Sequence, residues 1–203
     1  MSRNENGATP ETGLPDQKLL QRFVESFSSH DDLLAADDTP AEMLVEQSSE
    51  TWGSWSEPCT WKPIVRETDA SALIPLSQKL PGPLPQLYEQ LVLHWRWLEV
   101  DLGSLILFAN PPGPGLAGLE ATLFRDAALT ETLLPAGYVP FGRSTINYDP
   151  ICFDLNRTNA DSDCPILQFE HEALLCHVKI GDHQQRWSSF RELMTDVIRS
   201  AGV

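Results

Sequence analysis

Two aspartates flank a short apolar run in the C-terminal half of the chain. Asp149 precedes residues 150–153 and Asp154 follows them. A pair of carboxylates can act as general acid and general base, or can hold a hard cation. Asn147-Tyr148-Asp149-Pro150 is also typical of a turn in which an aspartate accepts hydrogen bonds from backbone N–H groups, and Asp154 can do the same at a strand end. The pattern favours the turn interpretation.

The densest group of potential metal ligands comes later in the chain. Glu170-His171-Glu172 is followed by His177. A helical zinc motif needs two histidines four residues apart, but the fourth residue after His171 is Leu175. On a strand, His171 and the two glutamates would point to opposite faces. The pattern therefore favours a strand end with one inward histidine that is hydrogen-bonded to backbone, rather than a metal site.

Other motifs for catalysis or cofactor binding are incomplete. Residues 111–118 are rich in glycine, but no Lys-Ser/Thr follows, and three prolines remove the N–H donors that a phosphate loop needs. No Gly-x-Ser-x-Gly elbow is present. Cys152 lies in an apolar run, where cysteine behaves as a small hydrophobic residue rather than as a nucleophile. We therefore expect no catalytic residues, no cofactor, no metal and no enzymatic activity.

The charge balance restricts the kinds of partner. The chain has 203 residues, with 29 Asp and Glu against 14 Lys and Arg, and a net charge of −15. Nucleic acids and anionic membrane surfaces both require a basic face, so neither is expected as a partner. The acid excess favours a basic protein partner, or simply high solubility.

Targeting signals and cysteine usage predict the compartment. No run of 18 apolar residues is present, and the first seven residues lack the apolar region of a secretory signal. The four cysteines are widely spaced, with no CxxC pair among them, and we expect them to be free thiols. These features together predict a cytoplasmic protein.

Residues 1–60 hold much of the charge asymmetry, with 12 acids against 3 bases. Apolar residues at helical spacing predict a helix from Pro15 to Ser28. Thr39-Pro40-Ala41-Glu42 is a capping box that predicts a second, short helix. Three tryptophans that follow closely on one another need cover from the rest of the protein: Trp52, Trp55 and Trp61. We interpret residues 1–60 as an acidic helical N-terminal extension.

The pattern changes after this extension. A helix is predicted over residues 83–95, a helical turn over 129–134, and a closing helix from Trp187 to Gly202. Short apolar runs bounded by turn residues predict strands over 105–109, 138–141, 151–154 and 166–169. Helices followed by a run of strands and a final helix predict an α+β fold, with an antiparallel or mixed sheet and flanking helices.

Several short motifs follow one another between residues 80 and 200. They are Pro81-Gly82-Pro83-Leu84-Pro85, residues 95–101, 107–113, 137–142, 148–154 and 165–172, and Ser188-Ser189-Phe190-Arg191-Glu192-Leu193. In order and spacing this series resembles the SUKH superfamily, the Smi–Knr-like immunity-protein domain. Glu170 stands where the family has an aspartate before His-Glu, which weakens any ligand role for it. The resemblance identifies residues 61–203 as a SUKH-like domain and implies a strongly bent central sheet.

The resemblance also implies a function. Bacterial members of the superfamily are commonly immunity proteins, which bind and neutralise toxins, many of them nucleases. A basic nuclease groove would attract an acidic inhibitor, which agrees with the charge of this chain. A regulatory or scaffold interaction module is the alternative role within the superfamily, with the acidic extension as a docking surface. A metal-binding hydrolase that uses Asp149, Asp154, His171 and Glu172 is the second alternative.

Five residues within the family motifs are candidates for contact with a protein partner. They combine acidic and aromatic side chains between the predicted elements, where loops carry function: Trp97, Glu99, Asp101, Tyr148 and Asp149. Trp97 has a second interpretation as a core residue, whose loss would unfold the domain rather than weaken binding.

Overall fold

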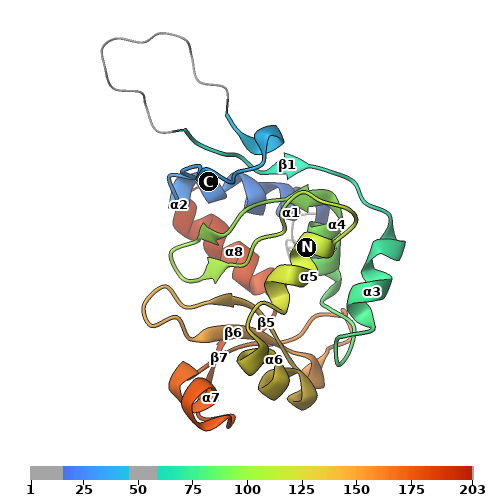
Figure 1. Ribbon diagram of the computed structural model, residues 1–203, viewed down its shortest axis with the longest axis vertical. Coiled ribbons are helices and arrows are strands. Elements are labelled where there is room, and N and C mark those ends of the chain that lie inside the picture. Colours follow the sequence, from blue (N-terminus) through green and yellow to red (C-terminus); the bar gives the residue numbers. More distant parts are fainter. Residues whose placement is uncertain (1–15, 46–58, 203) are drawn as a thin grey trace, which may run out of the picture.

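The computed structural model describes residues 16–45 and 59–202, and Trp52 and Trp55 lie outside these ranges. The fold is α+β, as predicted (Figure 1). Six strands form one antiparallel sheet in which each strand pairs with the next along the chain. They are β3 Val100–Asp101, β4 Ile106–Leu107, β5 Tyr138–Arg143, β6 Pro150–Asp154, β7 Ile166–Phe169 and β8 His183–Trp187. A separate antiparallel pair joins β1 Ile64–Val65 to β2 Trp95–Arg96.

The N-terminal helical segment folds as two helices. α1 spans Asp16–Glu25 and α2 spans Phe27–His30, so the single helix predicted over 15–28 is interrupted at Ser26. The short helix predicted after Thr39 is the 3-10 turn η1, Ala41–Met43. The apolar face of these elements belongs to the main core of the protein: Leu19, Leu20, Phe23, Val24, Phe27 and Met43. The described part of the acidic extension is therefore packed onto the domain.

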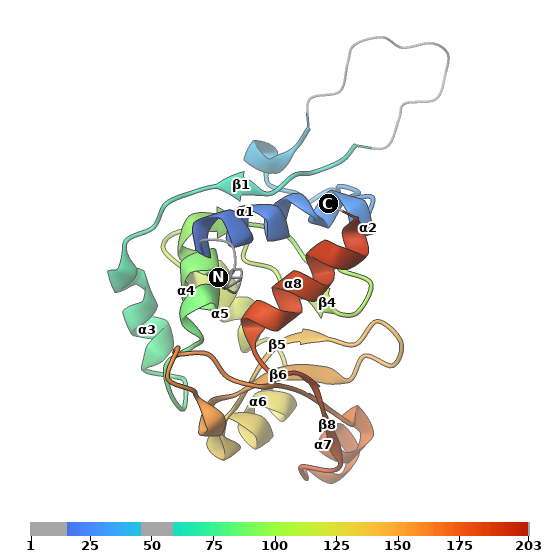
Figure 2. The ribbon, with the colours of Figure 1, turned by 180° about the vertical axis from the view of Figure 1, so that it is seen from behind.

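The closing helix α8, Phe190–Ala201, lies between α1 and strands β5 and β6 (Figure 2). It ends as predicted at Gly202, whose φ of 73° is the left-handed conformation that glycine favours. The predicted start at Trp187 was wrong, because Trp187 is the last residue of β8. Buried side chains recur along α8 at helical spacing, and its amphipathic pattern is thus the reason it was predictable.

The remaining helices connect the strands. They are η2 Ala70–Leu73, α3 Ile74–Ser77, α4 Gln86–His94, α5 Ala117–Leu123, α6 Ala127–Leu133, η3 Leu134–Ala136, η4 Leu155–Arg157 and α7 His171–His177. The helices predicted near 83–95 and 129–134 correspond to α4 and α6. The glycine-rich residues 111–118 lead into α5. Glu170-His171-Glu172 was wrongly placed on a strand, because β7 ends at Phe169 and His171 is the first residue of α7.

Aromatic rings at the centre of the core hold α4 and α8 against the sheet. The rings of Phe141 on β5 and Phe153 on β6 stack with centroids 3.9 Å apart. Tyr88 of α4 and Phe190 of α8 contact this stack edge-on. Next to Phe141, a Cβ on Gly142 would lie 2.7 Å from the carbonyl oxygen of Ile106, so β4 and β5 could not approach as they do. This packing fixes the position of the β5–β6 hairpin.

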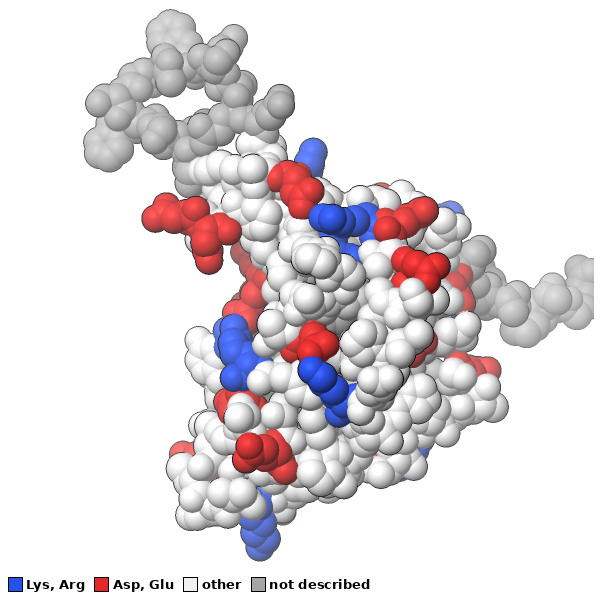
Figure 3. Space-filling view, turned by 45° about the vertical axis from the view of Figure 1, so that its right-hand side comes forward, with Lys and Arg blue, Asp and Glu red and all other residues white. Residues whose placement is uncertain are grey.

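The surface carries both signs of charge. Figure 3 shows acidic and basic side chains interspersed over one face of the molecule, with no large patch of a single sign. Within residues 16–45 and 59–202, no helix is long and apolar enough to cross a membrane.

Candidate functional site

The two carboxylates that flank β6 lie at opposite ends of that strand. Asp154 comes five positions after Asp149 along extended chain, which at 3.3 Å per residue places them about 16 Å apart. General acid–base catalysis or shared cation binding requires carboxylates that are much closer to each other. The structure therefore does not bring them into one site.

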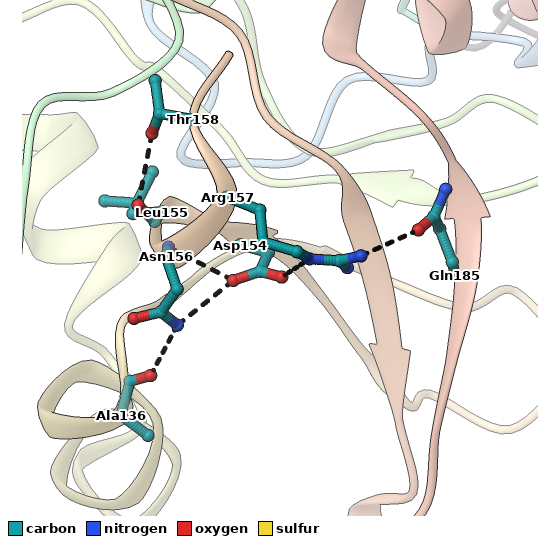
Figure 4. Close-up of polar contacts among 7 residues, drawn as sticks. All are labelled: Ala136, Asp154, Leu155, Asn156, Arg157, Thr158 and Gln185. Atoms are coloured by element: carbon teal, nitrogen blue, oxygen red, sulfur yellow. Dashed lines mark hydrogen bonds and ion pairs between the residues drawn. The ribbon is translucent and has the colours of Figure 1, made fainter.

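Asp154 is buried and stabilises the loop after β6. Its carboxylate accepts hydrogen bonds from the backbone N and the side-chain Nδ2 of Asn156, at 3.2 and 3.1 Å. Arg157 donates from Nε to the other oxygen, and Arg157 also reaches Gln185 on β8 (Figure 4). Asn156 continues the network to the carbonyl of Ala136. This is the capping role that the turn interpretation predicted.

Asp149 is also buried, and it joins the β5–β6 hairpin to the start of α7. Its Oδ1 accepts a hydrogen bond from the backbone N of His171 at 3.0 Å and lies 2.7 Å from Nδ1 of the same histidine. Its Oδ2 accepts from Gln168 at 2.8 Å and from Asn147 at 2.6 Å. Asp149 therefore accepts a hydrogen bond from a backbone N–H group, as predicted. The N–H group belongs to the first residue of α7, 22 residues later, rather than to the local turn.

The surroundings of Asp149 displace its pKa in two directions. Burial raises the pKa of the carboxyl, but hydrogen bonds from Gln168, His171 and Asn147 outweigh this effect, so the net pKa lies below the ordinary value. The ionised form is therefore the stabilising one. Its contribution to the free energy of unfolding is present above the ordinary pKa of about 4 and is lost as the pH falls below it.

Replacing this aspartate provides a pH-dependent test. Asp149→Asn keeps the shape but turns an NH₂ group toward donors, and it should cost about 1–3 kcal/mol at pH 7. The difference from wild type should shrink when thermal unfolding is measured at pH 3, because the wild-type carboxylate is then being protonated. Asp161→Asn, at an exposed position, is the matched control. An equal loss at both pH values would contradict the role assigned to the ionised carboxylate.

A hollow of about 260 Å³ lies beside the Asp149 network. It opens between α5, α6, the β5–β6 hairpin and α7. Apolar surface predominates in its walls, which also include two arginines, two threonines, one aspartate, one tyrosine and one histidine: Phe108, Thr122, Leu123, Arg125, Asp126, Leu129, Thr130, Pro140, Arg143, Tyr148, Pro150, His171 and Leu175.

An ion-pair network lies at the rim of this hollow. Glu99 binds Arg143 through Oε1 at 2.5 Å and Arg125 through Oε2 at 3.5 Å. The Arg143 guanidinium lies 5.2 Å from the centroid of the Tyr148 ring, a cation–π distance. Tyr148 nevertheless remains 61% exposed, at a left-handed φ of 59° that is uncommon for an aromatic residue. A solvated aromatic ring is thus held next to an apolar hollow.

No family model, curated protein or solved structure matches this chain. The resemblance to the SUKH superfamily therefore stays a prediction, and the geometry has to support any function by itself.

The five predicted contact residues occupy three kinds of position. Glu99, Tyr148 and Asp149 lie at the hollow or bind its wall residues. Trp97 does not line the hollow; it is fully buried and donates from Nε1 to the carbonyl of the wall residue Phe108 at 2.9 Å. Asp101 lies elsewhere, at the end of β3, where its side chain accepts a hydrogen bond from the backbone N of Gly103. Of the two interpretations of Trp97, partner contact or core residue, the structure supports the core residue.

The potential metal ligands do not form a cluster. In the part of the chain that the structure describes, no group of three or more His, Cys, Asp or Glu side chains could hold a metal ion. Glu172 is exposed on α7, and His171 is engaged by Asp149. The prediction of an inward histidine at a strand end, hydrogen-bonded to backbone, was therefore wrong: His171 begins α7, its side chain is 37% exposed, and its ring lies against a carboxylate.

Most residues that line the hollow were not singled out from the sequence, among them Arg125, Arg143 and Leu175. Arg143 is the last residue of β5, and Tyr148 follows it across a short turn. The contact between their side chains could therefore have been predicted from the strand and turn pattern. Arg125 and Leu175 come from α5–α6 and α7, and no local pattern placed them beside the hairpin.

Proposed function

We propose that this chain is a non-catalytic protein-binding domain that acts in the bacterial cytoplasm as an immunity protein, neutralising a cognate toxin such as a nuclease. The observation that carries the proposal is the exposed Tyr148 beside the apolar hollow. Tyrosine and arginine are the side chains most often found at binding hot spots. The resemblance to the SUKH superfamily supplies the toxin as the class of partner.

The size of the hollow favours a protein partner over a small molecule. Pockets for drug-sized ligands occupy about 300–1,000 Å³ and enclose most of the ligand. At about 260 Å³ this hollow fits one large side chain of a partner. Two exposed apolar residues extend the surface around it, Ile146 at the hairpin tip and Leu175 on α7. Exposed apolar groups next to a hollow are typical of an interaction site.

The net negative charge of the protein would attract a basic partner at long range, without a direct contact at the hollow. Glu99 is neutralised by two arginines and Asp149 is hydrogen-bonded internally, so neither presents an unpaired carboxylate at the hollow. The net charge of −15 resides mainly elsewhere and would accelerate the approach of a basic toxin. We therefore assign affinity to the hollow and the hairpin, and the rate of association to the overall charge.

Affinity purification from the native host, with the intact protein as bait, tests the proposal. We expect one basic toxin-domain protein that stays bound in high salt and whose toxicity is suppressed when the two are co-expressed. Recovery of regulatory or envelope proteins instead would overturn the immunity function in favour of an interaction module. The metal-binding hydrolase predicted from the sequence has no observation in its favour, because the described residues include no group of three potential ligands.

A further inference from the structure

A second surface lies at the opposite end of the molecule from the hollow, next to α1, α2 and β1 (Figure 1). It is a groove of about 540 Å³, bounded by α1 and α2 on one side and by a ribbon of extended chain on the other. Residues 59–62 form the middle of that ribbon. They pair with residues 33–35 through the bond from Trp61 N to Leu33 O, and with residues 43–45 through the bond from Val45 N to Thr60 O.

The walls of this groove are apolar and aromatic. Trp61 and Trp95 line it together with Val24, Leu33 and Val45. Val24, Leu33 and Trp61 are buried beneath its surface, whereas Val45 is 37% exposed, and Leu34, the neighbour of Leu33 in the chain, is 56% exposed. Apolar side chains that remain in contact with water along a groove indicate a surface available to a partner.

The charges at this groove are predominantly negative. Glu25, Asp31 and Asp32 line it, against the single cation Lys62. The chain from residue 25 to residue 45 contains six acids and no lysine or arginine. Asp31 is engaged by the backbone N of Leu33 and Asp101, whereas Asp32 is exposed and makes no hydrogen bond or ion pair with a described residue. The negative potential is therefore directed at least partly to solvent.

From this combination we infer that the groove binds a protein segment in which lysine or arginine alternates with apolar side chains. The apolar side chains would cover the floor formed by Trp61 and Val45, and the cations would lie against Asp32 and Glu25. The half-buried indole of Trp95, which also lines the groove, can attract a cation and would add to the selectivity for a basic segment. This surface is separate from the hollow at Tyr148, so the inference goes beyond the proposed function.

A peptide titration followed by NMR of the full-length ¹⁵N-labelled protein tests this inference. The probe is an eight-residue peptide of alternating lysine and leucine, and the charge-reversed control is the same peptide with glutamate for lysine. We expect shifts at the amides of residues 31–34, 43–45 and 60–62 and at the indoles of Trp61 and Trp95. Shifts spread evenly over the surface, or equal binding of the glutamate peptide, would overturn the inference.

Charge-reversal variants separate local from overall attraction. The double variant Asp32→Lys with Glu25→Lys should weaken binding of the lysine–leucine peptide at least tenfold. Asp37→Lys with Asp38→Lys changes the net charge equally at exposed positions that do not line the groove, and it should weaken binding less than threefold. Equal losses in both double variants would overturn a local site. Tyr148→Ala should leave peptide binding unchanged, so the outcome does not depend on the proposed function.

Discussion

Trp97→Ala should destabilise the domain severely, by about 3–5 kcal/mol for the cavity, with a further loss of about 1 kcal/mol for the indole hydrogen bond. The side chain is fully buried, its ring lies edge-on to Phe27 of α2, and its Nε1 donates to the carbonyl of Phe108. Its backbone also pairs with Asn110 in both directions, at 3.1 and 3.0 Å. Trp97 thus joins α2 to Phe108, one of the residues that line the hollow.

Thermal unfolding monitored by circular dichroism measures this effect. Because natural domains are stable by about 5–15 kcal/mol, the melting temperature should fall by about 10 °C or more. Trp97→Phe, which retains a ring but no donor, is the control and should lose far less. An unchanged melting temperature together with lost partner binding would show that Trp97 is a partner contact instead.

The second large effect is expected at Asp163, which caps the central helix from a distant loop. Its buried carboxylate accepts hydrogen bonds from the backbone N of Phe190 at 2.9 Å and of Arg191 at 3.2 Å, and from Cys164 at 2.8 Å. Ser189 caps the next free N–H, that of Glu192. The first N–H groups of a helix have no partner within the helix, so these side chains complete the N-terminus of α8.

Asp163→Ala leaves three backbone donors without their acceptor, and it should cost about 3 kcal/mol. For a chain of this size, that loss corresponds to a decrease in melting temperature of about 6–12 °C. Asp163→Asn retains one acceptor oxygen and should lose roughly half as much, whereas Asp161→Asn in the same loop should change nothing. A melting temperature unaffected by Asp163→Ala would show that water replaces the cap at no cost.

Elements with a strong local signal were predictable from the sequence. The strand predicted over 166–169 coincides with β7, and the apolar spacing of α8 indicated a helix even though its start was misplaced. The capping role of Asp154 followed from its position at a strand end, because its partners are the next residues along the chain.

What was missed depends on contacts between distant segments. α7 begins at His171 because Asp149, 22 residues earlier, accepts its backbone N–H, and Glu170-His171-Glu172 carries no sign of this. The cap on α8 comes from Asp163, 27 residues before Phe190. The hollow likewise combines the hairpin residue Tyr148 with Arg125 from another part of the chain. The spacing of residues along the sequence does not show which distant segments come into contact. Only Glu99, Tyr148 and Asp149 of the site were therefore anticipated.

We propose that Tyr148 and the hollow beside it form the surface that binds a protein partner. The most direct test is to measure the affinity of the purified partner for the wild-type protein and for Tyr148→Ala by calorimetry. Truncation of a hot-spot aromatic residue costs about 2 kcal/mol or more, so the dissociation constant should rise at least 30-fold, with the melting temperature unchanged. Ile74→Ala, exposed on α3 away from the hollow, is the control. An affinity that Tyr148→Ala leaves within threefold of wild type would contradict the account.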